Sequence, residues 1–180
     1  MEAAAETGIP IIILDRPNPL TGNLVSGPVL NIEFKTFVGY YPIPSLYGLT
    51  PGELALIIAD RQWISHVPTI DVIPMLGWNR DMWYDSTGIP WIPTSPNIPD
   101  LETAIVYPAT VLMEATNISE GRGTARPFRQ IGAPWLDGKK LTDAMNLRNL
   151  PGVKFGPISF TPLAIPGVAP NPKHLGTDCH

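Results

Sequence analysis

The chain has 180 residues with a net charge of −4, and 22 of its residues are proline. Average usage would give roughly 9 prolines, at about 5% of residues, so proline is in clear excess. The composition does not match a disordered linker, because 44% of the residues are apolar and five are tryptophan. The acidic balance gives no reason to expect nucleic acid as a partner. No apolar run approaches the roughly 18 residues that a membrane span needs.

The first half of the chain predicts a helix and a strand, followed by a second helix and a second strand. Residues 1–7 are strong helix formers, and Gly8 stands where a helix commonly ends. The β-branched and apolar run at residues 10–14 fits a central parallel strand. Thr50-Pro-Gly-Glu53 has the pattern of a capping box and predicts a helix that continues to about residue 64. Residues 69–73 form the second predicted strand.

The second half of the chain is less regular. Three prolines exclude regular structure from residues 91–99. The apolar run at residues 103–113 predicts a third strand, and residues 139–150 predict a short amphipathic helix. Residues 153–160 are interpreted as a further strand, and no element is expected in the last twenty residues. The alternation of strands and helices indicates an α/β fold.

Polar clusters follow the three predicted strands, which is where open α/β sheets bind ligands. The clusters are Asp15-Arg-Pro-Asn18, Asn79-Arg-Asp81 and Glu114-Ala-Thr-Asn117, and the last of them continues to Thr124. Arg16, Arg80, Arg122 and Arg126 are each able to bind a carboxylate with two hydrogen bonds, or to form scaffold ion pairs. We expect no metal or cofactor: Gly121-Arg-Gly-Thr124 lacks the nucleotide-binding spacing, and Cys179 is the only cysteine.

Glu114 and Glu120 are a possible carboxylate pair for glycoside hydrolysis, which commonly uses two such groups. In an extended chain they would lie about 20 Å apart, at 3.3 Å per residue, so they pair only if the intervening loop folds back. The alternative is that Glu114 ends a strand at the surface and Glu120 caps a turn. Glu53 is assigned to the capping box rather than to chemistry.

Six motifs occur in a fixed order between about residues 5 and 160: Leu14-Asp-Arg-Pro-Asn-Pro19, Gly48-Leu-Thr-Pro-Gly-Glu-Leu-Ala55, Pro93-Thr-Ser-Pro-Asn-Ile-Pro99, Glu114-Ala-Thr-Asn-Ile-Ser-Glu-Gly-Arg-Gly-Thr124, Pro127-Phe128 and Gly132-Ala-Pro-Trp135. In these motifs the chain closely resembles the bacterial exo-β-N-acetylmuramidase family (NamZ/YbbC-like), long catalogued as a domain of unknown function. The resemblance implies a glycosidase that releases N-acetylmuramic acid from the non-reducing ends of peptidoglycan fragments.

The resemblance also implies an architecture and a site. Residues 1–125 would be the C-terminal part of a Rossmann-like subdomain, and residues 126–180 the start of a smaller α/β subdomain, with a cleft between the two. Glu120 is the preferred acid/base residue and Glu114 the second carboxylate. Arg122 or Arg16 would bind the lactyl carboxylate of muramic acid. The residues expected to bind substrate are Asp15, Arg16, Asn18, Arg80, Asn97, Asn117, Arg122 and Thr124.

The sequence departs from the family pattern in ways that affect the function. It contains no Pro-Glu-His-Gly segment, whose glutamate is a leading catalytic candidate in the family, and Ala115 replaces a glycine. We therefore expect an internal piece, or an incomplete gene model, of a protein roughly twice as long. Its substrates would be muropeptides or disaccharides from peptidoglycan, outside the cytoplasm or in the periplasm. The alternative function is a non-catalytic protein that binds peptidoglycan or sugars.

Overall fold

The structure is a computed structural model that describes residues 1–180. It separates into two units, Met1–Pro90 and Trp91–His180. Each has its own buried residues, among them Ala55 and Ile58 in the first unit and Phe128 and Ala133 in the second. The boundary expected after residue 125 falls inside the second unit, and its meaning as a domain boundary stays a prediction.

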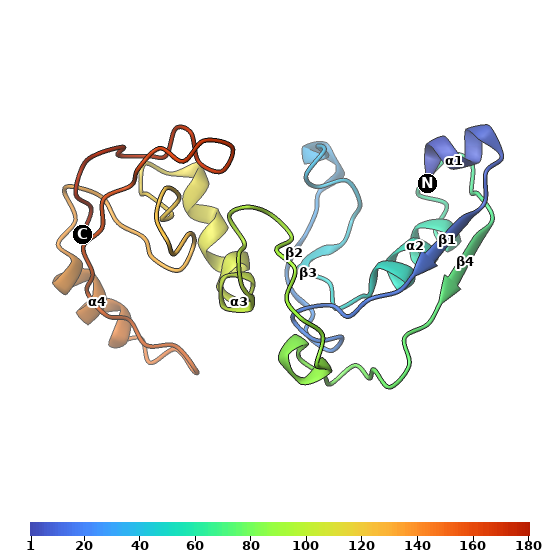
Figure 1. Cartoon of the computed structure of the whole chain (residues 1–180), viewed down its shortest axis with the longest axis horizontal. Helices are drawn as coiled ribbons and strands as arrows, with labels where there is room; N and C mark the ends of the chain where they lie inside the picture. Colours follow the sequence, from blue (N-terminus) through green and yellow to red (C-terminus); the bar gives the residue numbers. More distant parts are fainter. The chain divides into compact units, whose positions relative to one another are not determined.

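The first unit is built on a strand–helix–strand arrangement (Figure 1). Strand β1 (Ile11–Leu14) pairs in parallel with β4 (Ile70–Ile73), and Ile11 stands opposite Ile70 in the register. Helix α2 (Pro51–Asp60) connects them and contacts both strands. Parallel strands need such a crossover, because the chain must return to the end of the sheet where the first strand began before it can form the second. The predicted α/β class with a parallel sheet is confirmed.

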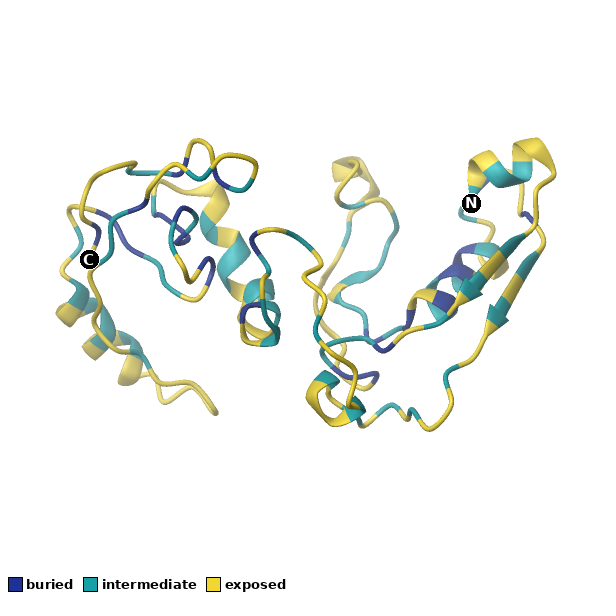
Figure 2. Ribbon diagram, viewed as in Figure 1, coloured by how far each residue is buried: buried dark blue, intermediate teal, exposed yellow.

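Helix α2 begins as its sequence predicts. The Thr50 hydroxyl accepts a hydrogen bond from the Glu53 amide at 3.1 Å, and the Glu53 carboxylate accepts one from the Thr50 amide at 3.0 Å. Each bond satisfies a donor that the first turn would otherwise leave free. The buried side of the helix carries Ala55 and Ile58 (Figure 2).

Two smaller elements complete the first unit. Helix α1 (Glu2–Thr7) ends at Gly8, whose φ of 66° is the left-handed conformation expected there. An antiparallel pair, β2 (Ser26–Val29) and β3 (Pro44–Leu46), lies between β1 and α2 in the sequence, where no element was predicted. Short 3-10 helices cover Ile32–Phe34 (η1) and Tyr84–Thr87 (η2).

The expectation of a central strand at residues 10–14 is wrong for this structure. Strand β1 has one neighbour, and Ile12 and Leu14 are 65% and 73% exposed. The apolar run thus predicts a strand correctly, but it does not show how many strands lie beside it. Apolar residues on both faces of a strand indicate that other elements can pack on both faces. The number of neighbouring strands depends on the tertiary fold.

The predicted third strand is also wrong, because residues 101–110 form helix α3 (Leu101–Thr110) in the second unit. Asp100 caps this helix, since its carboxylate accepts a hydrogen bond from the Thr103 amide at 2.7 Å. Pro108 lies inside the helix and donates no backbone bond. The apolar run suggested a strand, whereas the structure has a helix that Asp100 caps. Glu114 therefore lies in the following 3-10 helix η3 (Val111–Ala115) rather than after a strand.

The rest of the second unit is mostly irregular. The predicted short helix is confirmed as α4 (Gly138–Asn146), capped by Asp137. No strand forms at residues 153–160, where only Phe160 pairs with Cys179 in an isolated bridge. Gly156 and Pro157 interrupt this segment, and proline has no amide for a ladder bond. The longest helices have ten residues, and none combines the length and apolar character needed to cross a membrane.

Candidate active site

Two of the predicted site residues, Asp15 and Asn18, follow β1 at the carboxyl end of the parallel pair in the first unit. Asp15 directly follows β1 and accepts hydrogen bonds from the Thr50 hydroxyl at 2.7 Å and the Gly52 amide at 2.8 Å. Its carboxylate thus stands at the N-terminus of α2, where a negative charge is stabilised by the helix dipole. Asn18 donates to the Leu49 carbonyl at 3.0 Å.

Arg80 is held by several partners in the same unit. Its Nη1 donates to the Glu53 carboxylate at 2.6 Å, and its Nη2 donates to the carbonyls of Gly22 and Gly48, both at 2.8 Å. The guanidinium thus ties the loop after β4 to two loops that precede α2. Arg16, by contrast, has an exposed side chain. The structure brings Asp15 and Arg80 together through Thr50 and Glu53, and we call these four residues the first-unit network.

The Glu114–Thr124 motif folds back in the second unit around two glycines. Gly121 and Gly123 have φ angles of 79° and 81°, a left-handed region that favours glycine. A Cβ atom on Gly121 would lie 2.8 Å from the Gln130 carbonyl oxygen, and one on Gly123 would overlap the Leu163 carbonyl oxygen. The loop therefore needs both glycines. Arg122 lies between them in the sequence, so their close packing fixes the backbone that carries its side chain.

Phe128 supports this loop from inside. It is 1% exposed and has a left-handed φ of 61°, which is a strained conformation for a bulky residue. Its amide donates to the Glu120 carbonyl at 2.6 Å, and the Arg122 guanidinium lies 5.3 Å from the centre of its ring. Strain of this kind persists only where the surrounding structure imposes it, and it is common at functional sites.

Glu114 and Glu120 meet at one guanidinium. Arg122 forms an ion pair with Glu114 through Nη2, and its Nε lies 3.9 Å from Oε1 of Glu120. The Glu120 side chain is 4% exposed, whereas those of Glu114 and Arg122 are 35% and 39% exposed. All three line a cavity of about 240 Å³. The sequence left open whether the loop folds back, and in the structure it does.

Lys173 is a charged residue of this cavity that sequence reasoning missed. Its Nζ lies 2.9 Å from Oε2 of Glu120, 2.7 Å from the Met113 carbonyl and 3.0 Å from the Ile118 carbonyl. It comes from a proline-rich segment, residues 168–173, that also lines the cavity. No sequence pattern links this segment to Glu120, because the contact spans more than fifty residues. Glu114, Glu120, Arg122 and Lys173 are called the cavity cluster below.

Of the remaining predicted residues of the second unit, Asn97 and Thr124 hold backbone in place with their side chains, and Asn117 does not. Asn97 donates to the Val168 carbonyl at 2.9 Å, and so supports the proline-rich segment. The Thr124 hydroxyl donates to the Gly121 carbonyl at 2.7 Å and closes the glycine loop. The Asn117 side chain is exposed, and its carbonyl contacts a ring nitrogen of His174 at 2.8 Å. Only Asn97 and Thr124 are therefore tied by their side chains to the loops of the cavity.

Tyr107 lies next to the cavity cluster. Its ring packs edge-on against Phe128 at a centroid distance of 4.8 Å. Burial raises the pKa of the Tyr107 hydroxyl above its usual value of 10.0, and the nearby Glu114 charge raises this pKa further, while Arg122 lowers it in part. Tyr107 is therefore an uncharged side chain that packs against Phe128 beside the cluster.

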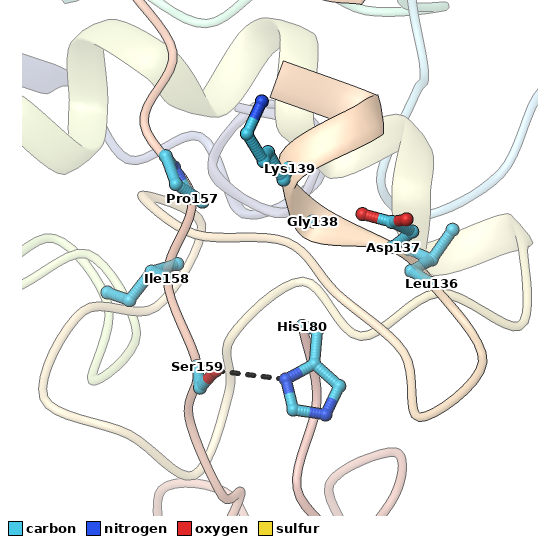
Figure 3. A pocket seen from close by; sticks show the side chains of 8 residues that line it. All are labelled: Leu136, Asp137, Gly138, Lys139, Pro157, Ile158, Ser159 and His180. Atoms are coloured by element: carbon cyan, nitrogen blue, oxygen red, sulfur yellow. Dashed lines mark hydrogen bonds between the residues drawn. The ribbon is translucent and has the colours of Figure 1, made fainter. Parts of the chain in front are cut away.

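A second cavity of about 370 Å³ lies near the start of α4 in the same unit (Figure 3). Ser159 Oγ and His180 Nδ1 are 2.9 Å apart in it. A Ser–His–Asp arrangement would also need a carboxylate that orients the histidine. Asp137 lines this cavity, but both of its oxygens contact Lys140, at 3.0 Å to the amide and 3.4 Å to Nζ. The larger cavity is therefore the weaker candidate for chemistry.

Fold and site together define an α/β protein whose second unit holds a carboxylate pair with two cations in one cavity. Residues 1–102 match the family described as "Exo-beta-N-acetylmuramidase NamZ, N-terminal", and residues 105–180 match the corresponding C-terminal family. The chain thus belongs to the NamZ family. Over all its 180 residues it is 48% identical to the "Peptidoglycan beta-N-acetylmuramidase NamZ" of Bacillus subtilis (strain 168), and it spans 41% of that relative's length.

Two crystal structures of DUF1343 family proteins from Bacteroides fragilis NCTC 9343 are similar to the chain. One has a TM-score of 0.91 and 38% sequence identity, with 99% of this chain and 45% of that chain covered. The other has a TM-score of 0.80 and 39% identity, with 100% and 45% covered. The chain therefore spans less than half the length of each of these relatives.

Proposed function

We propose that this chain takes part in glycoside hydrolysis of peptidoglycan fragments, with release of N-acetylmuramic acid from their non-reducing ends. The observation that carries the proposal is the buried Glu120 carboxylate in a cavity where Arg122 also holds Glu114. Family membership and the printed name of the Bacillus subtilis relative support it. A muropeptide or disaccharide is the proposed substrate, and wall material outside the cytoplasm or in the periplasm is the proposed place of action.

The proposed chemistry divides the work between the two carboxyl groups. Hydrolysis of a glycosidic bond needs a proton for the leaving oxygen, and a carboxylate that activates water or attacks the sugar. Glu120 suits the role that stays negatively charged, because Arg122 and Lys173 both face its oxygens. Glu114 is the second carboxyl group and is more open to solvent.

Arg122 is the proposed recognition residue for the lactyl carboxylate that distinguishes muramic acid from glucosamine. Its Nε has no hydrogen-bond partner in the structure, although it is buried. A guanidinium can bind a carboxylate with two parallel hydrogen bonds. Arg122→Ala is therefore expected to lower turnover of muramic acid glycosides selectively. Equal losses on muramic acid and glucosamine glycosides would contradict this assignment.

The proposed reaction is tested with a chromogenic N-acetylmuramic acid glycoside. The unchanged chain, Glu120→Gln and Glu6→Gln are compared, because Glu6 is an exposed carboxylate on α1. We expect turnover with the unchanged chain and with Glu6→Gln, and a loss of about 10²- to 10⁴-fold with Glu120→Gln, as for removal of an acid–base group. Absence of turnover by the unchanged chain would refute the proposal for this chain.

A non-catalytic sugar-binding role is the second candidate. It is favoured by the ion pairs that already occupy both carboxylates of the cavity. This candidate predicts that the chain binds peptidoglycan fragments in a calorimetric titration but releases no sugar from them. Release of N-acetylmuramic acid by the unchanged chain, and not by Glu120→Gln, would exclude it.

A further inference from the structure

Lys173 is fixed in place by several contacts with the loops around Glu120. Its Nζ donates to the carbonyls of Met113 and Ile118, at 2.7 and 3.0 Å. Its side chain is 28% exposed, so much of its stem is covered. An ammonium group has three donors, and two of them are used by these carbonyls. The position of the charge is therefore set by the backbone of η3 and of the segment that leads from η3 to the glycine loop.

The contact between Lys173 and Glu120 differs from an ordinary surface ion pair. Nζ lies 2.9 Å from Oε2, although Oε2 has no hydrogen bond of good geometry, so the contact is an ion pair held by charge. Oε2 is also shielded from solvent. Lys173 therefore compensates the charge of the buried carboxylate and covers one of its oxygens. Oε1, on the Arg122 side, is the oxygen left for a reaction.

The segment that carries Lys173 is held firmly by its neighbours. His174 has a left-handed φ of 56°, its ring contacts the Asn117 carbonyl at 2.8 Å, and it packs edge-on against Trp135. Leu163 donates to the Gly123 carbonyl at 2.9 Å. Strain at His174 persists because these contacts impose it. The C-terminal segment and the Glu120 loop thus form one fixed arrangement within the second unit.

We propose that Lys173 is a positioning residue that holds the Glu120 carboxylate in a single orientation and keeps its charge compensated. The inference rests on the proposed function, because it takes Glu120 as the reacting carboxylate. Lys173 acts through Glu120 and does not itself contact the substrate. The other charged groups that face Glu120 are Arg122 and, beyond it, Glu114.

The test compares Lys173→Met, which keeps most of the stem but removes the charge, with Lys173→Arg, which keeps the charge. Lys154→Met is the matched control, since Lys154 is exposed and forms no ion pair. On the chromogenic glycoside we expect Lys173→Met to lower kcat by about 10²-fold with little change in KM, as for a misplaced catalytic group. The acidic limb of its pH–rate profile should move to higher pH. Lys173→Arg should restore part of kcat.

A second readout does not depend on turnover. With ¹³C-labelled glutamate, the Glu120 carboxyl signal is identified by its loss in Glu120→Gln and then followed against pH. We expect its titration to move to higher pH in Lys173→Met and to return toward the original in Lys173→Arg. An unchanged titration in Lys173→Met would overturn the inference. Absence of turnover by the unchanged chain would refute the proposed function alone, and the titration would still decide the role of Lys173.

Discussion

The two units use the same types of charged residue in different ways. In the first-unit network, Arg80 donates to one carboxylate and two carbonyls, and Asp15 accepts from the start of α2. In the cavity cluster, Glu120 Oε2 and Arg122 Nε are buried without hydrogen-bond partners. A fully paired network rigidifies a fold, whereas buried polar atoms without partners are costly.

This difference teaches which predicted site residues belong to the scaffold. The first-unit network joins the end of β1, the loop after β4 and the N-terminus of α2, so its partners are all parts of the fold. The cavity cluster concentrates two carboxylates and two cations around an open volume. The charged side chains with buried atoms that lack a hydrogen bond, Glu120 and Arg122, both belong to the cavity cluster.

The largest expected effect separates Glu120 of the cavity cluster from Glu53 of the first-unit network, each of which faces an arginine. Glu120→Gln should lower turnover by about 10²- to 10⁴-fold, the usual range for an acid–base group. Glu53→Gln should instead lower the free energy of unfolding by about 1 kcal/mol, because it removes the negative charge that pairs with Arg80, while glutamine still serves the capping box. Rates are compared at a temperature where circular dichroism shows each variant folded, and stabilities by urea unfolding. A similar loss of turnover in both variants would contradict the assignment of Glu120 to the reaction and of Glu53 to the scaffold.

The next effect contrasts two left-handed glycines, one from each unit. Gly123→Ala should lower the free energy of unfolding by about 3 kcal/mol, from the left-handed backbone and the clash with the Leu163 carbonyl. Gly8→Ala should cost about 1 kcal/mol, because a Cβ there meets nothing within 4 Å. Urea unfolding measures both. Equal costs would show that the glycine loop has room to adjust.

The third effect concerns Arg80 of the first-unit network. Arg80→Ala should lower the free energy of unfolding by about 2 kcal/mol, because hydrogen bonds to a charged group are lost at a half-exposed site. The melting temperature should fall by about 4–8 °C. Arg80→Lys should restore little, since a lysine cannot present two nitrogens to three acceptors. Full rescue by lysine would mean that charge alone matters at this position.

The smallest effect is the pH dependence of a helix cap in the second unit. Burial raises the pKa of the Asp100 carboxyl, but hydrogen bonds from Thr103 and the charge of Arg129 outweigh it and leave this pKa below its usual value of 3.8. A lowered pKa gives stability that is present above the unfolded-state pKa and is lost as pH falls through the folded-state pKa. Asp100→Asn keeps a capping side chain but removes the charge.

The melting temperatures of the unchanged chain and Asp100→Asn should therefore differ at neutral pH and converge as the pH falls below 3.8. Thr50 caps α2 without a titratable group, so Thr50→Ser serves as the control and should show no such convergence. A difference between the unchanged chain and Asp100→Asn that stays constant down to low pH would contradict the assigned role of the Asp100 charge.

Local patterns in the sequence predicted several elements well. Thr50-Pro-Gly-Glu53 predicted the start of α2 because the capping box involves residues only three apart. Gly8 and the run at residues 10–14 predicted the end of α1 and the position of β1 for the same reason. The strand expected at residues 103–113 was wrong, because a short apolar run fits a strand or a buried helix equally well, and the capping position of Asp100 was not considered.

The sequence by itself determined the family and the α/β class, and it named Glu114, Glu120 and Arg122 as candidates, since these inferences depend on motifs and local spacing. The tertiary structure alone decided which charges meet. Glu114 and Glu120 reach one guanidinium because the glycine loop turns back, and Lys173 joins them across more than fifty residues. It also separated Arg80, which the scaffold has already paired, from Arg122, whose Nε has no partner. Contacts between distant segments depend on the packing of the whole unit, and local patterns do not encode them.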